Sequence, residues 1–153
     1  MLDKLDGIWS QLTDGNRLAS TGILLSTFGF FSTWVAIFPT ATTYANYSGL
    51  TFASASPSLY FVFIAGLSAA GLLYLAFQYG QLRSLDTYGY IAIAIFALFI
   101  LGTQVFAQVT SDDFAGFVVE YRPAIWAVIL GHVAIIVGGY LNLRESGMRL
   151  PLN

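Results

Sequence analysis

The stretch of sequence that decides the fold is PAIWAVILGHVAIIVGGYLNL, residues 123–143. It has no charged residue when its histidine is neutral, and as an α-helix it is long enough to cross the hydrocarbon core of a bilayer. Small residues recur in it at steps of three and four, so they share one stripe of the helix. Such a stripe lets a neighbouring membrane helix approach closely, which predicts a packing surface. The stripe consists of Ala124, Ala127, Gly131, Ala134 and Gly138.

The composition of the whole chain points to the same class of protein. Of its 153 residues, 57% are hydrophobic and 9% are charged, whereas a soluble domain carries about 25% charged residues. A soluble core of this size would not bury so much apolar surface, so we expect an integral membrane protein. The absence of cysteine excludes disulfides, thiolate metal sites and thiol nucleophiles. A net charge of −2 offers no basic surface for nucleic acid.

Three further apolar stretches complete a predicted bundle. The first ends before Pro39, and the short polar connection at residues 80–88 makes the second and third spans antiparallel neighbours. The sequence therefore predicts an all-α integral membrane protein, with four transmembrane helices in an antiparallel bundle and a tail at residues 144–153. The predicted spans are residues 18–38, 59–79, 89–109 and 123–143.

Residues 1–17 are expected to form a short amphipathic helix in the membrane interface. Charged residues interrupt the apolar run, which is not the pattern of a signal peptide. The apolar positions nevertheless fall at helical spacing, which favours an interfacial helix. They are Leu2, Leu5, Ile8, Trp9 and Leu12.

The distribution of basic residues predicts the orientation. Of the six Lys and Arg residues, five fall on the side of the two termini and only Arg122 falls on the other. The positive-inside rule then places both termini in the cytoplasm of a multi-pass protein of the cell membrane. The basic residues on the cytoplasmic side are Lys4, Arg17, Arg83, Arg144 and Arg149.

The two outward connections are expected to lie on the bundle. Residues 39–58 carry no charge, and we expect a small hairpin over the outer surface; the apolar residues 114–119 are expected on the membrane surface. The tripeptide Asn46-Tyr47-Ser48 matches an N-glycosylation acceptor, so Asn46 is a candidate glycosylation site. Aspartate outnumbers glutamate and lysine is scarce, which suits a protein that works in high salt, although drift in a small set of charges is the alternative.

Small residues also mark the first two spans as packing surfaces. In the first span, glycine and hydroxyl residues share one stripe of the helix. In the second span, the residues near the middle have small side chains, so another helix can approach closely there. The candidate packing residues are Gly22, Ser26, Gly29 and Thr33 in the first span, and Gly66 and Ala70 in the second.

The only polar pair that suggests a ligand site is His132 with Gln104. His132 is the single histidine of the chain, and at bilayer depth it is expected to be neutral. Counted along ideal helices, His132 lies about 13 Å and Gln104 about 8 Å below the outer ends of their spans. A hydrogen bond between the two side chains is therefore feasible if the helices adjoin. Two roles for His132 are open. It could bind haem or a quinone, or it could be a buried structural histidine that is hydrogen-bonded to a neighbouring helix.

The predicted function follows from these residues. No predicted span contains Asp, Glu, Lys or Arg, the groups that proton-coupled pumps and retinal proteins need, so neither catalysis nor a cofactor is predicted. We expect a non-catalytic accessory or structural subunit, which packs with itself as a homo-oligomer or with a larger membrane complex. The alternative is a redox, quinone or haem-linked membrane anchor that uses His132. A small-solute channel or carrier is the third hypothesis.

Overall fold

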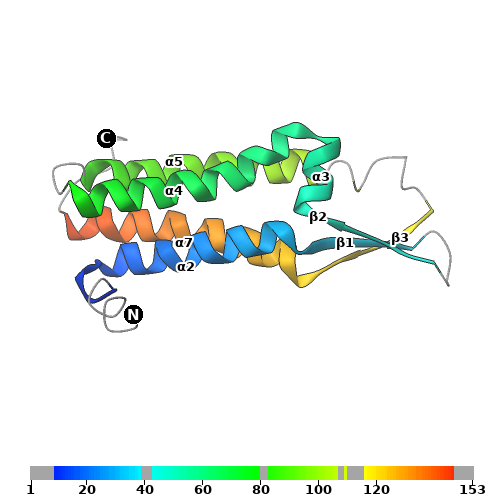
Figure 1. The fold of residues 1–153 in the computed structure, drawn as a ribbon, viewed down its shortest axis with the longest axis horizontal. Helices are drawn as coiled ribbons and strands as arrows, with labels where there is room; N and C mark the ends of the chain where they lie inside the picture. The colour runs from blue at the N-terminus through cyan, green and yellow to red at the C-terminus, as the bar shows by residue number, and fades with distance from the viewer. Residues whose placement is uncertain (1–8, 39–42, 80–82, 107–108, 110–115, 147–153) are drawn as a thin grey trace.

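A computed structural model describes residues 9–38, 43–79, 83–106, 109 and 116–146, without the side chains of residues 83–86. In this part of the chain, four long helices lie side by side and a small sheet extends from one end of them (Figure 1). The first and last described residues of the chain, 9 and 146, lie toward the opposite end. The long helices are α2 (Asp14–Phe31), α4 (Tyr60–Gln78), α5 (Arg83–Leu101) and α7 (Pro123–Glu145).

Shorter elements connect these helices. A π-helical turn, η3 (Gly102–Phe106), continues α5. A short helix α3 (Gly49–Ala55) and the 3₁₀ turn η1 (Pro57–Leu59) lead into α4. The strands are β1 (Thr33–Phe38), β2 (Ala45–Ser48) and β3 (Val118–Tyr121).

Three helical segments are long and apolar enough to cross a membrane, so the chain has the character of a membrane protein. They match the predicted second, third and fourth spans to within a few residues. The helix α2 is not among them, because it opens with Asp14, Asn16 and Arg17. The three segments are Pro57–Gln78, Thr87–Phe106 and Pro123–Glu145.

The all-α prediction is wrong at the first span. The helix begins at Asp14, where Thr13 accepts a hydrogen bond from the amide of Asn16 as the N-cap, and it ends at Phe31. The rest of the predicted span, from Thr33 to Phe38, is strand β1. Hydropathy does not separate an apolar strand from an apolar helix, but the run TWVAIF is rich in the aromatic and β-branched residues that favour strands. Residues 1–8 of the predicted amphipathic helix lie outside the described residues.

The sheet also corrects both outer connections. β1 is the central strand, with β2 and β3 antiparallel on either side. In the described part of the segment 39–58, residues 45–48 form β2, which extends beyond the end of the bundle, and residues 49–55 form α3; residues 39–42 lie outside the described residues. Residues 118 and 119 belong to β3 instead of a surface segment, and residues 114 and 115 lie outside the described residues. Val35 pairs with both Tyr47 and Tyr121, which joins parts of the chain far apart in sequence.

The helices α2 and α7 share the closest interface of the bundle. A Cβ atom added at Gly22 would lie 2.3 Å from the carbonyl oxygen of Gly131, and one added at Gly131 would lie 2.6 Å from the carbonyl oxygen of Gly22. About two turns further along α7, a Cβ on Gly138 would lie 2.5 Å from the carbonyl oxygen of Gly15. Glycine is therefore required at these positions, because backbone atoms of the partner helix occupy the space of a side chain.

Two buried clusters fill the interior. One lies at the sheet end and includes Phe30, Trp34 and Phe52, whose rings contact one another through Trp34. The other lies between the helices nearer the termini. Its buried members are Ala19, Ile23, Ala69, Tyr90, Ala94 and Ile135.

Candidate functional site

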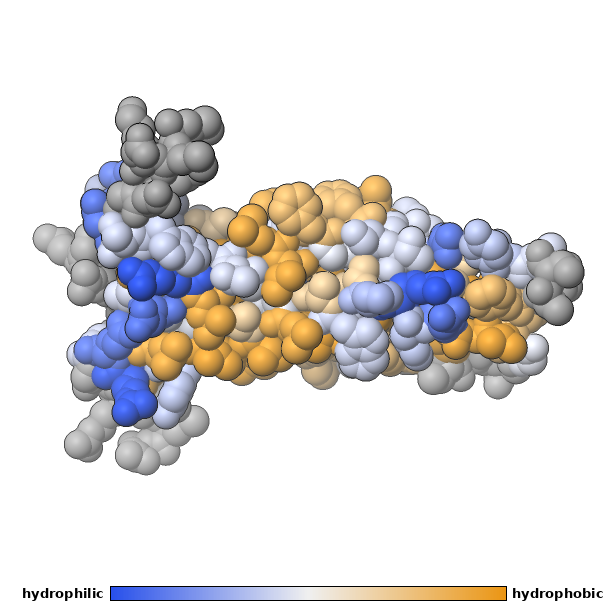
Figure 2. All heavy atoms as spheres, turned by 90° about the horizontal axis from the view of Figure 1, so that it is seen from below, coloured by the Kyte–Doolittle hydropathy of each residue, from blue (hydrophilic) through white to orange (hydrophobic). Residues whose placement is uncertain are grey.

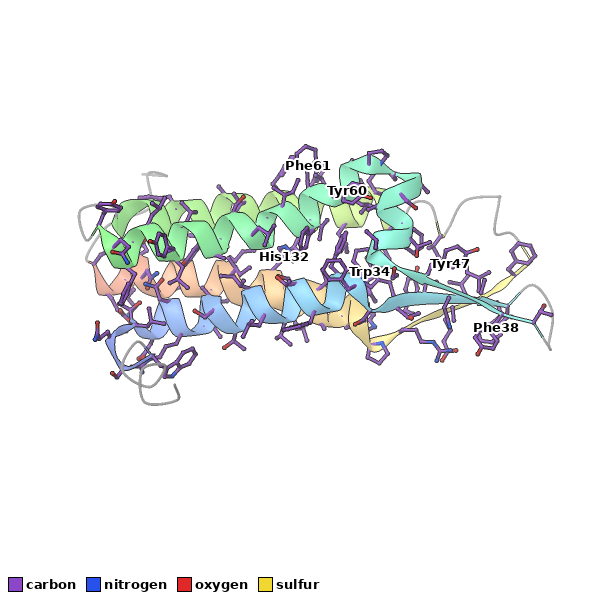
Figure 3. The ribbon with its side chains drawn as sticks, in the orientation of Figure 1. Trp34, Phe38, Tyr47, Tyr60, Phe61 and His132 are labelled. Atoms are coloured by element: carbon purple, nitrogen blue, oxygen red, sulfur yellow. The ribbon has the colours of Figure 1, made fainter. Side chains whose placement is uncertain are left out.

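His132 lies inside the bundle, between helices, and is 1% exposed. Figure 3 shows it in the middle of the bundle, away from the labelled residues of the sheet. Its Nδ1 is 2.9 Å from the carbonyl oxygen of Val128. Because a carbonyl only accepts, the Nδ1 of a neutral ring in this geometry carries the proton and donates. Nε2 is then an acceptor.

That acceptor has no hydrogen-bond partner among the described residues. The backbone of Val62 on α4 lies close enough to act on the ring electrostatically, but it does not meet hydrogen-bond geometry with Nε2. A buried acceptor left without a donor costs about 1–3 kcal/mol. The Nε2 of His132 is therefore a buried nitrogen without a hydrogen-bond partner among the described residues.

Gln104 does not join His132. It lies in the π-turn η3, where its Oε1 accepts a hydrogen bond of 2.9 Å from the hydroxyl of Ser56. Ser56 is also 3.2 Å from the hydroxyl of Ser58. The expected Gln104–His132 hydrogen bond is thus not formed, and Gln104 instead ties the end of the α5–η3 helix to the turn before α4.

A polar pocket of about 380 Å³ opens at the end of the bundle that carries the termini. Beside it, the hydroxyl of Thr13 donates to Oδ1 of Asn142 at 2.7 Å, and Nδ2 of Asn142 donates to Oδ1 of Asn16 at 2.8 Å. Both asparagines are buried. These hydrogen bonds join the start of α2 to the end of α7. The pocket is lined by Gln11, Leu12, Thr13, Asn16, Ala76, Phe77, Thr87, Asn142, Glu145 and Ser146.

The chemistry of this pocket is that of hydrogen bonding. Among its lining residues only Glu145 is charged, so no pair of groups is present there for general acid–base work. The cluster around Ala19, Ala69 and Ala94 fills the bundle beyond the pocket. Sequence reasoning missed the pocket because Asn16 and Asn142 lie near the ends of their helices, where polar residues are common.

The predicted packing residues fall into three groups. Gly22, Gly29, Gly131, Ala134 and Gly138 lie in the α2–α7 interface. Gly66 faces Ser26, since a Cβ on Gly66 would lie 3.1 Å from the Ser26 hydroxyl, and Ala70 packs against the buried cluster near the termini. Ala124 and Ala127 line a groove on the outside of α2 and α7. Thr33 is not in a helix; it begins β1.

The sheet has one buried face and one open face. Residues paired directly across strands share a face: Val35, Tyr47 and Tyr121 point into the core, where burial raises the pKa of the Tyr121 phenol. On the opposite face, Phe38 pairs with Val118, while Ala36 pairs with Asn46 and Glu120. Figure 3 agrees, with Tyr47 and Phe38 on opposite sides of the sheet. We call this open surface the outer face of the sheet; it consists of Phe38, Asn46, Val118 and Glu120, whereas Ala36 between them is fully buried.

The outer face is accessible. Val118 is 67% exposed, and Asn46 and Glu120 are exposed as well. The candidate glycosylation residue Asn46 therefore lies on an accessible strand. The burial of the residues in β3 alternates along VVEY, which is typical of a half-buried strand, but among the residues themselves only Glu120 is a polar signal of the exposed face.

No model of a known protein family matches the chain, and neither does any curated protein or solved structure. The fold and composition define the class: a mostly helical protein with helices suited to a membrane and a small sheet beyond one end.

Proposed function

We propose that the chain crosses the membrane four times, as an antiparallel bundle with both termini in the cytoplasm. Two observations support a crossing by α2 in addition to the three apolar helices. α2 packs along α7 from Gly15 to Gly29, against positions from Gly138 to Ala124, and the start of α2 lies at the same end of the bundle as the end of α7 (Figure 1). The excess of basic residues at that end favours the cytoplasmic side.

The function that we propose is that of a non-catalytic membrane subunit which presents its sheet to a partner outside the membrane. The partner is another membrane protein or a second copy of the chain. The observation that carries the proposal is the way in which the sheet is fixed to the bundle. β1 follows α2 after one residue, and β3 is followed by α7 after one residue. The two strands thus continue the two helices that pack most closely.

Hydrogen bonds at the junction hold the sheet in place. The indole Nε1 of Trp34 donates to the carbonyl oxygen of Gly29 at 2.8 Å, and the amide of Arg122 donates to the carbonyl oxygen of Trp34 at 2.7 Å. Trp34 is fully buried. The pairing of β1 with β2 shifts register between Thr33 and Val35, and such a bulge re-aims a side chain, here toward the core. A surface held this firmly binds a partner with little loss of conformational freedom.

The outer face has the composition of a contact surface. Val118 pairs with Phe38 across the two strands, and the ring centroid of Phe38 is 5.8 Å from that of Tyr44. Tyr44 is 63% exposed. Exposed aliphatic and aromatic side chains next to polar ones are typical of the central part of a protein interface. In the part of the chain that the structure describes, β2 and β3 each have one edge without a neighbouring strand, and exposed edges accept further strands.

Photo-crosslinking in native membranes tests this proposal. A photoreactive phenylalanine analogue at Val118 is expected to give a discrete crosslinked band, which mass spectrometry identifies. The same analogue at Phe96, which is 51% exposed on α5, is the control for contacts within the bilayer. A discrete band from Val118 with none from Phe96 supports the proposal. Absence of any adduct at Val118, in cells that express the chain at its native level, contradicts it.

A second candidate function is ligand binding at His132, and the free Nε2 acceptor favours it. The geometry limits which ligands could bind, because an unprotonated Nε2 accepts a hydrogen bond or coordinates a metal ion. A quinol hydroxyl or the iron of haem fits that requirement, whereas the carbonyl oxygen of an oxidised quinone does not. The anchoring of Nδ1 on a backbone carbonyl is also the arrangement that orients metal-bound histidines.

An absorption spectrum of the purified protein tests this second function. Bound haem is expected to give a Soret band that is lost in both His132→Gln and His132→Leu. A colourless protein that folds equally well with glutamine at this position, and that gains no thermal stability from added quinol, contradicts both forms of the hypothesis.

A further inference from the structure

A narrow apolar groove of about 330 Å³ runs along the outside of the bundle between α2 and α7. Its floor is low because three small residues lie there: Gly29, Ala124 and Ala127. The hydroxyl of Ser32, at one end, is already bonded to the carbonyl oxygen of Phe28 at 3.0 Å, so the groove offers no free polar group of its own. The lining residues are Leu24, Leu25, Phe28, Gly29, Ser32, Pro123, Ala124 and Ala127.

The groove lies within the hydrophobic surface of the bundle and ends near the sheet. Figure 2 shows this side of the molecule, where hydrophobic surface over the helices gives way to a hydrophilic patch toward the sheet. From Leu24 to Ser32 the helix rises about 12 Å. The groove is thus long and shallow, and lies parallel to the helices.

A charged pair lies at the sheet end of the groove. Arg122 directly precedes the lining residue Pro123, and its Nη1 is 3.2 Å from Oε1 of Glu120. The side chains are 36% and 52% exposed, so the ion pair contributes only about 0–1 kcal/mol and its members are free to bind other charges. Among the described side chains at this end of the bundle, these two charges stand where the helix α7 begins, beside the start of the groove.

We propose that the groove binds one phospholipid with an amine headgroup. One acyl chain lies along the small residues of the groove, the phosphate binds the Arg122 guanidinium, and the ammonium group binds the Glu120 carboxylate. The charge pattern is the reason for this choice of occupant, because a positive and a negative side chain side by side complement a zwitterionic headgroup. A transmembrane helix of a partner is a poorer occupant, because it would bring no charged groups to pair with Arg122 and Glu120. Charged groups in a helix within the hydrocarbon core are costly.

Native mass spectrometry of the detergent-purified protein tests the proposal, with phosphatidylethanolamine and phosphatidylglycerol as probes. We expect one molecule of phosphatidylethanolamine to be retained in preference to phosphatidylglycerol. Ala127→Leu fills part of the groove and displaces about two methylene groups, which lowers the affinity about tenfold. Val133→Leu, at an exposed position of the same helix that does not line the groove, is the matched control and leaves binding unchanged.

Two further variants separate the charges. Arg122→Gln is expected to weaken binding of both lipids, whereas Glu120→Gln removes the preference for the amine headgroup and leaves phosphatidylglycerol bound. Thermal unfolding in detergent checks that each variant is folded. Lipid retention that is equal in Ala127→Leu, Arg122→Gln and the control overturns the proposal, as does a dimer of the chain that Ala127→Leu abolishes.

Discussion

The substitution Gly131→Ala tests the close contact between α2 and α7. The added Cβ would lie 2.6 Å from the carbonyl oxygen of Gly22 and 2.7 Å from the amide nitrogen of Ser26. An ordinary contact needs at least 3.4 Å. Both neighbours are backbone atoms, so a rotamer change does not relieve the overlap. The helices have to move apart by about 0.8 Å, which loosens packing along the interface.

The expected magnitude follows from the cost of overpacking. An extra methyl group in a tightly packed interior costs about 1–3 kcal/mol, and alanine regains up to about 1 kcal/mol through its higher helix propensity. We expect a net loss of about 1–2 kcal/mol in the free energy of unfolding, measured by denaturant titration in mixed micelles. The control is Gly71→Ala on α4, where the added Cβ meets nothing within 4 Å; it is expected to be neutral or stabilising.

A double variant sharpens this test. Gly22 faces Gly131, so the separation that one alanine forces also makes room for the other. The loss in Gly22→Ala/Gly131→Ala should therefore be smaller than the sum of the two single losses, whereas Gly71→Ala/Gly131→Ala should be additive. If Gly131→Ala is as well tolerated as Gly71→Ala, the contact between the two helix backbones is not as close as described.

Two more predictions concern the polar contacts that join elements. Asn142→Ala removes the hydrogen bonds from Thr13 and to Asn16, and the loss of these buried contacts should lower the free energy of unfolding by about 1–3 kcal/mol. Asn142→Asp keeps an acceptor for Thr13 and should cost less at a pH low enough to protonate it; an alanine variant that loses less than the protonated aspartate variant would contradict the network. Trp34→Phe keeps an aromatic ring but removes the hydrogen bond to Gly29, so a loss of about 1 kcal/mol is expected, together with faster hydrogen exchange in β1; unchanged exchange would show that this bond does not hold the sheet.

The three apolar helices were predictable because their length and hydropathy leave few alternatives in a bilayer. The stripe of Gly131 and Gly138 was recognisable by its spacing alone, although the sequence does not say which helix it contacts. The sheet was missed because β1 is as apolar as the helix before it, and its partner strand β3 lies some eighty residues away. Ser32 and the run of strand-favouring residues after it are the local signals of the change.

The candidate site was predictable only in part. His132 was recognised as a buried histidine, and the structure buries it. Its hydrogen bond, however, goes to Val128 of its own helix and not to a neighbouring helix. Its relation to Gln104 depended on how α7 and α5 are rotated about their axes, which depth along a helix does not specify. The structure turns Gln104 toward Ser56, within a π-helical turn that a sequence period of 3.6 residues does not anticipate.

The central claim, four crossings with the sheet outside the cell, is tested most directly by labelling single cysteines in intact cells. The chain has no native cysteine, so each introduced thiol reports one position. Ser10, Ser146 and Val118 are exposed positions before α2, after α7 and on the outer face of the sheet. We expect an impermeant maleimide to label Val118→Cys in intact cells, and to label Ser10→Cys and Ser146→Cys only after permeabilisation. If Ser10→Cys and Ser146→Cys label from opposite sides, α2 does not cross the membrane and the account is contradicted.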